Sequence, residues 1–352
     1  MSNINIIYLI PELKNPTGGA KVIYNHSHIL NKLDNKISSQ IIHLKKKLSY
    51  KLESSILKRI KVLNNKNSGW DITKMKVSKN FIPSKKWQNK NISLGKNLHF
   101  NNKKDFIILP EIWSHFAVDL NLIKKNINYS IFVQGFYHMN STDNFIKLKS
   151  AYENAKFIIT VSDYSMNYLK KMFPSMKSKI VKINFSVNTN KIKIAKKTNL
   201  ITFMPRKLKD HSNLLFFYLK EMLPKNWKVV PLVNLSEKKL FETLSKSKIF
   251  LSFSHLEGTG IPPIEAALSG NKVIGYDGGG GSTYWKKPIF TKIENGEIGD
   301  FGQKIIQNIK NYNLSWIKET AKQRRNLSKL YSHEQEQKSL MLLSNKILNL
   351  FK

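Results

Sequence analysis

The chain has 352 residues, enough for two ordinary domains, and 41% of its residues are apolar, enough to build a core in each. It contains no cysteine, so disulfides, thiolate nucleophiles and zinc–thiolate sites are excluded. Its formal net charge of +36 at pH 7 raises the question of a polyanionic partner, either a nucleic acid or an anionic membrane.

The distribution of the basic residues argues against specific nucleic-acid binding. The lysines are spread through nearly every segment, and only four arginines occur, although arginine is the residue that most often reads base edges. Loose attraction to anionic lipid fits better, because each lysine near a membrane surface can add about 1 kcal/mol. We therefore expect at most a loose association with an anionic membrane, and no specific nucleic-acid partner.

The N-terminal sequence predicts a strand rather than a targeting segment. The run MSNINIIYLIPEL has no basic lead and only a short apolar stretch, unlike a signal peptide. No window approaches the roughly eighteen uninterrupted apolar residues of a transmembrane helix. We expect a cytoplasmic protein, with peripheral binding at the inner face of the membrane as the alternative.

The first strand, residues 4–10, is rich in β-branched residues. It is followed by Gly18 and Gly19 and then by a helix predicted over residues 20–33. A strand, a Gly-Gly turn and a helix form the usual beginning of a Rossmann-like unit. Because no full GxGxxG is present, a plain strand–helix turn is the alternative.

Further apolar runs predict the rest of the first parallel sheet. They cover residues 38–44, 105–109, 130–133, 156–161 and 180–183. Ser162 is a good N-cap for a helix over residues 163–172. Residues 45–68 are rich in lysine and poorly periodic, which indicates a surface helix or an insertion.

Polar residues follow two of these strands. Ligands of open α/β sheets bind beyond the carboxyl ends of the strands, so polar residues there are candidates for a ligand-binding cleft. Glu111 follows the strand 105–109, and Gln134, Tyr137 and His138 follow the strand 130–133. An ordinary loop histidine is the alternative interpretation of His138.

The polar, aperiodic segment NTNKIKIAKKTN at residues 188–199 is typical of a linker. The sequence therefore predicts a first domain over residues 1–187 and a second over 200–332. The last helix, residues 333–352, is expected to cross back to the first domain. Its apolar face is formed by Leu340, Leu343, Ile347 and Leu350.

The second domain again alternates strands and helices. Strands are predicted over 200–204, 227–233 and 249–253, with helices over 213–223 and 237–245. Arg206 lies just beyond the end of the first of these strands, and Lys207 or Lys209 can supply a second positive charge. Such a pair suits a diphosphate, although Arg206 could also be an ordinary surface cation.

Residues 253–281 (FSHLEGTGIPPIEAALSGNKVIGYDGGGG) carry the most informative pattern. A covered strand ends at Phe253, and Gly258 and Gly260 then let the backbone bend and approach a ligand closely. Two prolines suit the first turn of the following helix, and Gly270 is placed to end it. The free N–H groups of residues 258–261 would point out of a helix start, where an anion such as a diphosphate is favoured.

Two carboxylates flank this predicted anion site, Glu257 just before the loop and Glu265 within the first turn of the helix. Because a carboxylate repels a phosphate, we expect both to reach hydroxyl groups of a sugar or ribose. The alternative for Glu265 is that it complements the helix dipole, worth about 0.3–1 kcal/mol. The four glycines at 278–281 are costly to order, so we predict that Gly279 and Gly280 lie in the cleft, with a mobile loop as the alternative.

The segment EGTGIPPIEAALSGNKVI resembles the glutamate-pair motif EGFGLPPLEAMACGxPVV of retaining GT-B glycosyltransferases of the group 1 (family 4) type. In both, seven residues separate the two glutamates. Thr259 stands where the family often has an aromatic residue, and Ser212 stands where it has a lysine. The resemblance covers both domains in outline, but only the second carries specific motifs.

The resemblance implies an α/β fold of the GT-B class, with two Rossmann-like parallel-sheet domains facing a central cleft. It places Glu257 near the transferred sugar as a catalytic residue and Glu265 on the ribose of the donor. It also implies a catalytic histidine near His138. The implied donor site contains Arg206, Lys207, Lys209, Gly258, Thr259, Gly260 and Ile261. The implied remainder of the cleft contains Gly18, Gly19, Glu111 and Gln134.

The sequence therefore predicts a glycosyltransferase that moves a sugar from a nucleotide-diphosphate donor to a glycan or lipid-linked acceptor. The resemblance implies retention at the anomeric carbon and a role in cell-surface polysaccharide synthesis. No Asp-x-Asp motif is present, so we expect no metal, and no cofactor besides the sugar nucleotide substrate. The alternatives are a catalytically silent sugar-nucleotide or glycan-binding protein on the same fold, or a basic nucleic-acid-binding protein.

Overall fold

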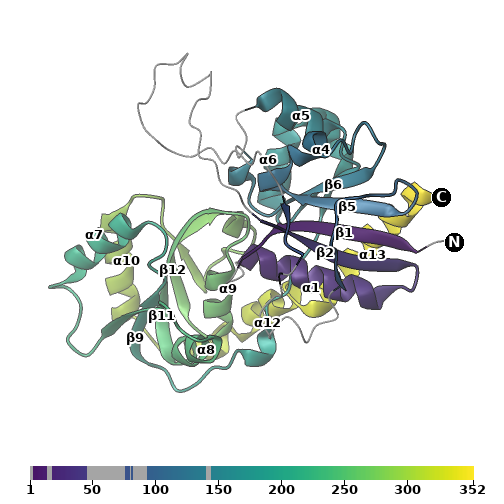
Figure 1. Cartoon of the computed structure of the whole chain (residues 1–352). Coiled ribbons are helices and arrows are strands. Elements are labelled where there is room, and N and C mark those ends of the chain that lie inside the picture. The colour runs from purple at the N-terminus through teal and green to yellow at the C-terminus, as the bar shows by residue number, and fades with distance from the viewer. Residues whose placement is uncertain (1–2, 14–17, 46–75, 80, 82–92, 140–143) are drawn as a thin grey trace, which may run out of the picture. The chain divides into compact units, whose positions relative to one another are not determined.

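The computed structural model (Figure 1) describes residues 3–13, 18–45, 76–79, 81, 93–139 and 144–352. The segment 45–68, predicted as a surface helix or insertion, lies outside the described residues except for its first residue. The chain forms two compact units. Unit 1 comprises Met1–Val161, Ser165–Asn184 and Gln337–Lys352, and unit 2 comprises Ser162–Tyr164 and Phe185–Glu336.

Unit 1 is built on a sheet in the order β3-β2-β1-β5-β6-β7-β8, with β4 also paired to β2. Among the described strands, only the β2–β3 pairing is antiparallel. The strands are β1 (Ile4–Pro11), β2 (Ile37–Lys45), β3 (Lys76–Val77), β4 (Ser93–Leu94), β5 (Asp105–Pro110), β6 (Asn128–Val133), β7 (Phe157–Thr160) and β8 (Ile180–Lys182). The predicted first sheet is confirmed. Apolar side chains fill both of its faces, as is typical of buried parallel strands.

Helices cover both faces of this sheet (Figure 1). The helical segments of this part of the chain are α1 (Gly18–Leu33), η1 (Glu111–Trp113), α4 (Phe116–Asp119), η2 (Phe136–His138), α5 (Phe145–Glu153), α6 (Asp163–Met172), η3 (Pro174–Lys179), α13 (His333–Leu348) and η6 (Asn349–Phe351). The cores on the two faces contain side chains of α4 and α5 and side chains of α1 and α13, respectively. Within the described part of the chain, no helix is long and apolar enough to cross a membrane.

The last helix packs on unit 1 through three of the four predicted apolar residues. Leu340, Leu343 and Ile347 are buried in the same core as Ile6 of β1. Leu350, the fourth, lies in η6 and is exposed, because the α-helix ends at Leu348 and the spacing of its face ends there.

Unit 2 is a five-stranded sheet in the order β10-β9-β11-β12-β13, and all of its pairings are parallel. Its strands are β9 (Thr198–Phe203), β10 (Lys228–Pro231), β11 (Ser247–Glu257), β12 (Lys272–Gly279) and β13 (Phe290–Lys292). Its helical segments are η4 (Thr189–Lys191), α7 (Lys209–Leu219), α8 (Glu237–Lys246), α9 (Ile261–Leu268), η5 (Gly280–Thr283), α10 (Ile298–Lys310), α11 (Trp316–Glu319) and α12 (Ala321–Leu330).

The segment 188–199, expected to be a linker, lies inside unit 2. Its residue Lys197 is buried, and the ammonium donates to the carbonyl oxygens of Leu244, Ser247 and Ser269 at 3.5, 2.8 and 2.6 Å. These carbonyls belong to α8, the start of β11 and the end of α9. Lys197 therefore joins three elements from a buried position, which the lysine-rich composition of the segment did not indicate.

The packing of α13 can be tested with two leucines that are neighbours in the sequence. Leu343 is 1% exposed and Leu342 is 56% exposed. Leu343→Ala should lower the free energy of unfolding of unit 1 by about 2–5 kcal/mol, because it leaves a cavity in a packed core. Leu342→Ala removes the same atoms from the surface and should change this free energy by no more than about 0.5 kcal/mol. Urea unfolding of both variants measures the difference, and equal effects would contradict the observed face of α13.

Candidate functional site

The glutamate that precedes the glycine loop is the last residue of a strand. β11 continues past Phe253, where the sequence predicts its end, to Glu257. Its pairing with β12 shifts register between Ser254 and Glu257, so that Ser254 pairs with Asp277 and Glu257 with Gly279. Glu257 is therefore held by the sheet and not by a loose loop, which fixes its backbone at the carboxyl edge of unit 2.

The loop after β11 leads directly into α9, as predicted. Gly260 is the N-cap of this helix and has φ +80°, a conformation that favours glycine, and the two prolines are the second and third residues of its first turn. At the other end, Gly270 also has φ +80° and follows the helix, as predicted. Tyr284 is buried, and its hydroxyl donates to the carbonyl oxygen of Gly260 at 2.7 Å. The helix start is therefore fixed both by its own backbone and by this hydrogen bond.

The four-glycine run packs its backbone against this loop. A Cβ atom on Gly280 would lie 2.1 Å from the carbonyl oxygen of Gly258, and Gly278 and Gly279 have φ values of +65° and +82°. A Cβ atom on Gly281 would meet only ordinary contacts, at 3.4 Å or more. Positive φ values therefore account for glycine at 278 and 279, and close backbone packing accounts for it at 280, without invoking a ligand.

The segment after β9 brings one of its two candidate lysines onto Glu257. The Lys207 ammonium lies 2.7 Å from Glu257 Oε1 and donates to the carbonyl oxygen of His255 at 2.7 Å. Arg206 and Lys209, on either side, are exposed. Ser212 is buried and donates to the carbonyl oxygen of Lys209 at 2.8 Å, so that position belongs to the packing of α7.

Glu265 lies further along α9 than predicted. The helix begins at Ile261, and no acidic residue lies in its first turn. The favourable effect of the helix dipole falls off within the first turn, so complementing the dipole is a weaker explanation for Glu265 than the sequence suggested. Thr259 is 5% exposed, and its hydroxyl has no hydrogen-bond partner among the described residues.

Asp277 is a third carboxylate at this edge, and the sequence motif did not single it out. Its Oδ1 accepts a hydrogen bond from the N–H of Gly279 at 2.9 Å, and Lys292 Nζ lies 3.6 Å from its Oδ2. Burial raises the pKa of the nearby Tyr284 hydroxyl well above its usual value, and the charges of Glu257 and Asp277 contribute. The sequence signal for Asp277 was a polar residue between a covered strand and a glycine run.

The arrangement in unit 2 combines a helix start with positive charge and hydroxyl-binding groups. The positive end of the α9 dipole and the exposed guanidinium of Arg206 suit an anion, while Glu257 can accept hydrogen bonds from hydroxyl groups. Among the described residues, no group of three or more His, Asp or Glu side chains is placed to hold a metal ion.

In unit 1, the carboxyl ends of β1 and β6 are joined by a glutamine. Gln134 Nε2 donates to the carbonyl oxygen of Gly19, at the start of α1, at 3.1 Å. A Cβ atom on Gly19 would lie 2.2 Å from Gln134 Oε1, whereas one on Gly18 would meet nothing within 4 Å. The amide of Gln134 therefore fills the space that a Cβ atom at position 19 would occupy, and a larger residue there would have to displace this flexible side chain.

Glu111 supports the same loop. It is buried, and its carboxylate accepts hydrogen bonds from the N–H groups of Gln134 and Gly135 at 3.3 and 3.0 Å. Burial raises its pKa to about 7, against the opposing effect of the backbone N–H donors. Tyr137 follows in η2, which ends at His138; the side chain of His138 lies outside what the structure describes.

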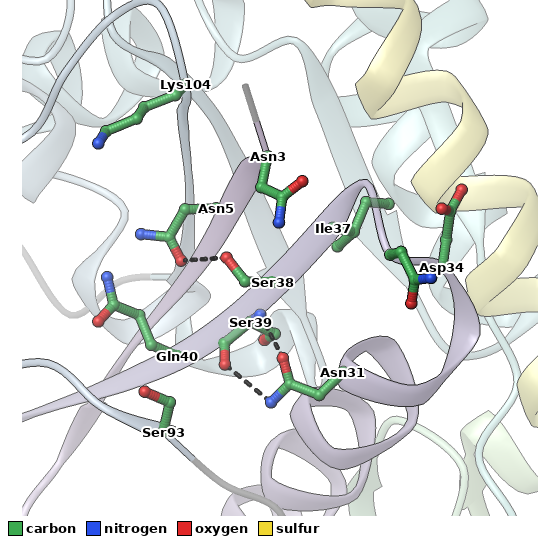
Figure 2. Close-up of a pocket in the computed structure, with 11 residues that line it drawn as sticks. Asn3, Asn5, Asn31, Asp34, Ile37, Ser38, Ser39, Gln40, Ser93 and Lys104 are labelled. Atoms are coloured by element: carbon green, nitrogen blue, oxygen red, sulfur yellow. Dashed lines mark hydrogen bonds between the residues drawn. The ribbon is translucent and has the colours of Figure 1, made fainter. Parts of the chain in front are cut away.

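A polar hollow of about 790 Å³ lies at the opposite, amino-terminal edge of the unit 1 sheet (Figure 2). Asparagine and serine side chains line it, and they bind one another: Asn31 pairs with the backbone of Ser39, and Ser38 donates to Asn5. None of the sequence-predicted site residues lines it. Since ligands of parallel sheets bind at the carboxyl edge, we do not regard this hollow as the functional site.

The comparisons with known proteins identify the fold. No family model matches the sequence, and the curated proteins contain no match. Among solved structures, HepE of Anabaena in complex with UDP has a TM-score of 0.66 at 10% identity, covering 97% of this chain and 100% of its own. Sucrose-phosphate synthase from Thermosynechococcus elongatus has a TM-score of 0.63 at 10% identity, covering 99% and 100%. The lipopolysaccharide outer core galactosyltransferase WaaB has a TM-score of 0.63 at 14% identity, covering 98% of this chain and 99% of its own.

These likenesses extend over nearly the full length of both chains. At such low identity they show the fold alone, and the fold is the GT-B fold of glycosyltransferases, with two Rossmann-like parallel sheets. The predicted fold class is therefore confirmed.

The backbone contact of Gly280 can be tested against its neighbour. Gly280→Ala places a methyl group against the backbone of Gly258, and should lower the free energy of unfolding of unit 2 by about 1–3 kcal/mol, the usual cost of overpacking. Gly281→Ala adds the same methyl group where only ordinary contacts occur, and should cost clearly less. Thermal unfolding of both variants decides, and an equal loss would show that the Gly258 contact is not the reason for glycine at 280.

The burial of Glu111 predicts a pH dependence. Its pKa rises from 4.5 to about 7 on folding, so between these values the folded state holds more protons than the unfolded state. Stability from this group is therefore lost as pH rises from about 4.5 to 7, by an amount on the order of 3 kcal/mol. Glu111→Gln cannot titrate, so the difference in unfolding free energy between wild type and variant should follow this course. A difference that stays constant with pH would contradict the raised pKa.

Proposed function

We propose that this protein is a glycosyltransferase that moves a sugar from a nucleoside-diphosphate donor to an acceptor hydroxyl group. The observation that carries the proposal is the carboxyl edge of unit 2, where the start of α9 lies beside Glu257 and its partner Lys207. The fold supports it, and the HepE structure of the same fold was solved with UDP.

Each part of the donor has a matching group in this proposal. The N–H groups at the α9 start and the guanidinium of Arg206 bind the diphosphate, which is the leaving group. Glu265, further along α9, binds the ribose hydroxyls, and Glu257, before the glycines, binds the transferred sugar. As the bond from the anomeric carbon to the diphosphate oxygen breaks, the acceptor oxygen bonds to that carbon, and its proton passes to the departing diphosphate. Glu257 then lies beside the positive charge that develops on the sugar, where it stabilises the transition state.

The acceptor is assigned to unit 1, at the edge that contains Gly19 and Gln134. We propose a glycan or a lipid-linked glycan, a hexose or related sugar as the transferred group, and cell-surface polysaccharide synthesis as the setting. The family resemblance of the glutamate motif supports retention at the anomeric carbon. His138 belongs to this edge by sequence, and we propose it as a further catalytic group.

The charge on the diphosphate is neutralised by protein groups in this proposal, without a metal and without a cofactor. Arg206 and the α9 start supply fixed positive charge where a divalent cation would otherwise be needed. The general excess of lysine favours loose attraction to an anionic membrane from the cytoplasmic side, near lipid-linked acceptors.

The two glutamates provide the test of this function. Glu265→Gln should weaken binding of the free nucleoside diphosphate and of the intact donor alike, because Glu265 contacts the ribose, which both ligands contain. Glu257→Gln should bind the nucleoside diphosphate at least as well as wild type but lose most of its turnover, since an interaction made mainly in the transition state acts on kcat. Calorimetry and steady-state rates, each with and without excess chelator, measure both effects.

The matched control is Glu221→Gln, which makes the same change at an exposed residue beyond α7 and should alter neither quantity. Identical behaviour of the two glutamate variants, or full turnover by Glu257→Gln, would refute the division of roles. Binding without any sugar transfer or donor hydrolysis would favour the catalytically silent alternative, and loss of turnover in chelator would refute metal independence.

A further inference from the structure

Lys207 makes two short contacts, and both are to the end of β11. Its ammonium lies 2.7 Å from Glu257 Oε1 and 2.7 Å from the carbonyl oxygen of His255. Both side chains of the pair are partly exposed, at 31% and 26%, so the pair lies at the surface of the site and not in the core. A ligand at the glycine loop can therefore reach it.

The backbone on both sides of this pair adopts costly conformations. Leu208 follows Lys207 and has φ +48°, and Leu256 precedes Glu257 and has φ +51°. A bulky residue in the left-handed region is uncommon, because its Cβ atom is crowded there, and such strain gathers at functional sites. Two strained leucines beside one ion pair indicate that the chain is shaped to bring this lysine onto this carboxylate.

The proposed function creates an electrostatic conflict at this point. A diphosphate bound at the α9 start carries negative charge, and Glu257 places another negative charge at the same loop. Like charges at close range, partly shielded from water, disfavour binding. Asp277, the neighbouring carboxylate, shares Lys292 with Glu294, at 3.6 and 3.1 Å, whereas Glu257 has the close contact with Lys207.

We propose that Lys207 is a positioning residue that neutralises Glu257, so that an anionic diphosphate can bind beside this carboxylate. The inference rests on the proposed function and adds a role that differs from direct phosphate binding. Arg206 and Lys209, the exposed cations on either side, remain available for the phosphates themselves. Lys207 also holds the Glu257 side chain in one orientation through the second contact to His255.

A double-mutant cycle separates neutralisation from direct phosphate binding. UDP is the first probe, followed by ADP and GDP, and the affinity is measured by calorimetry in four proteins: wild type, Lys207→Met, Glu257→Gln and the double variant. Lys207→Met should weaken binding at least about tenfold, because it leaves an unpaired carboxylate beside the phosphates. In the Glu257→Gln background the same change should weaken binding at least about fivefold less, because no carboxylate remains to repel the ligand.

Two controls test whether the loss of affinity comes from removing any surface lysine or from unfolding of the variant. Lys228→Met removes the same charge from an exposed lysine at the amino-terminal end of β10 and should change the affinity by less than about twofold. Thermal unfolding confirms that each variant is folded, and Lys207→Gln, which can still donate to His255, replaces Lys207→Met in the cycle if the latter is unstable.

The outcomes distinguish this inference from the function on which it rests. Equal weakening in both backgrounds would overturn neutralisation and make Lys207 a direct phosphate ligand. No weakening in either background would also overturn it. Failure of the wild-type protein to bind any nucleoside diphosphate would overturn the proposed donor, and this inference with it.

Discussion

The carboxyl edge of unit 2 depends on the contact between the backbones of Gly258 and Gly280. No side chain fits between them, since a Cβ atom on Gly280 would overlap the carbonyl group of Gly258. This contact continues the pairing of β11 with β12 beyond the regular ladder, and the hydroxyl of Tyr284 then fixes Gly260 at the start of α9. The strand end, the loop and the helix start are therefore one rigid assembly. The hydrogen-bond donors of the loop are already ordered in the folded protein, so a ligand would bind there without a further loss of conformational entropy.

In unit 1, side chains rather than backbone contacts hold the loop at the carboxyl edge of the sheet. Its loop after β6 is held by Glu111, whose carboxylate accepts two backbone N–H groups, and by Gln134, which reaches the start of α1. The carboxylate is buried, so its negative charge is unfavourable except for these donors, and its pKa is raised to about 7. The loop position and the ionisation of Glu111 are thus coupled, which makes Glu111 part of the support of this edge and not an exposed ligand of a cleft.

The sequence predicted the strands well because buried parallel strands are continuous apolar runs, and it predicted the start and end of α9 because proline and glycine have strict backbone preferences. The predictions from sequence failed where contacts between distant parts of the chain determine the structure. β11 continues to Glu257 because β12 is there to pair with it, and Lys197 is buried because three carbonyl groups converge on it. The pairing of Lys207 rather than Lys209 with Glu257 depends on the turn at Leu208, which no local pattern reveals.

The net charge of +36 is a poor guide to the site, because much of the local positive charge there is already paired. Lys207 lies against Glu257, and Lys292 lies near Asp277. The exposed Arg206 and Lys209 and the α9 start therefore remain as the groups best suited to an anion. The general field of surface lysines raises the concentration of any anion nearby and is screened by salt, so it carries no selectivity. Selectivity for the proposed sugar nucleotide over other anions must therefore come from the fixed geometry of the glycine loop and from the carboxylates, which accept hydrogen bonds from hydroxyl groups.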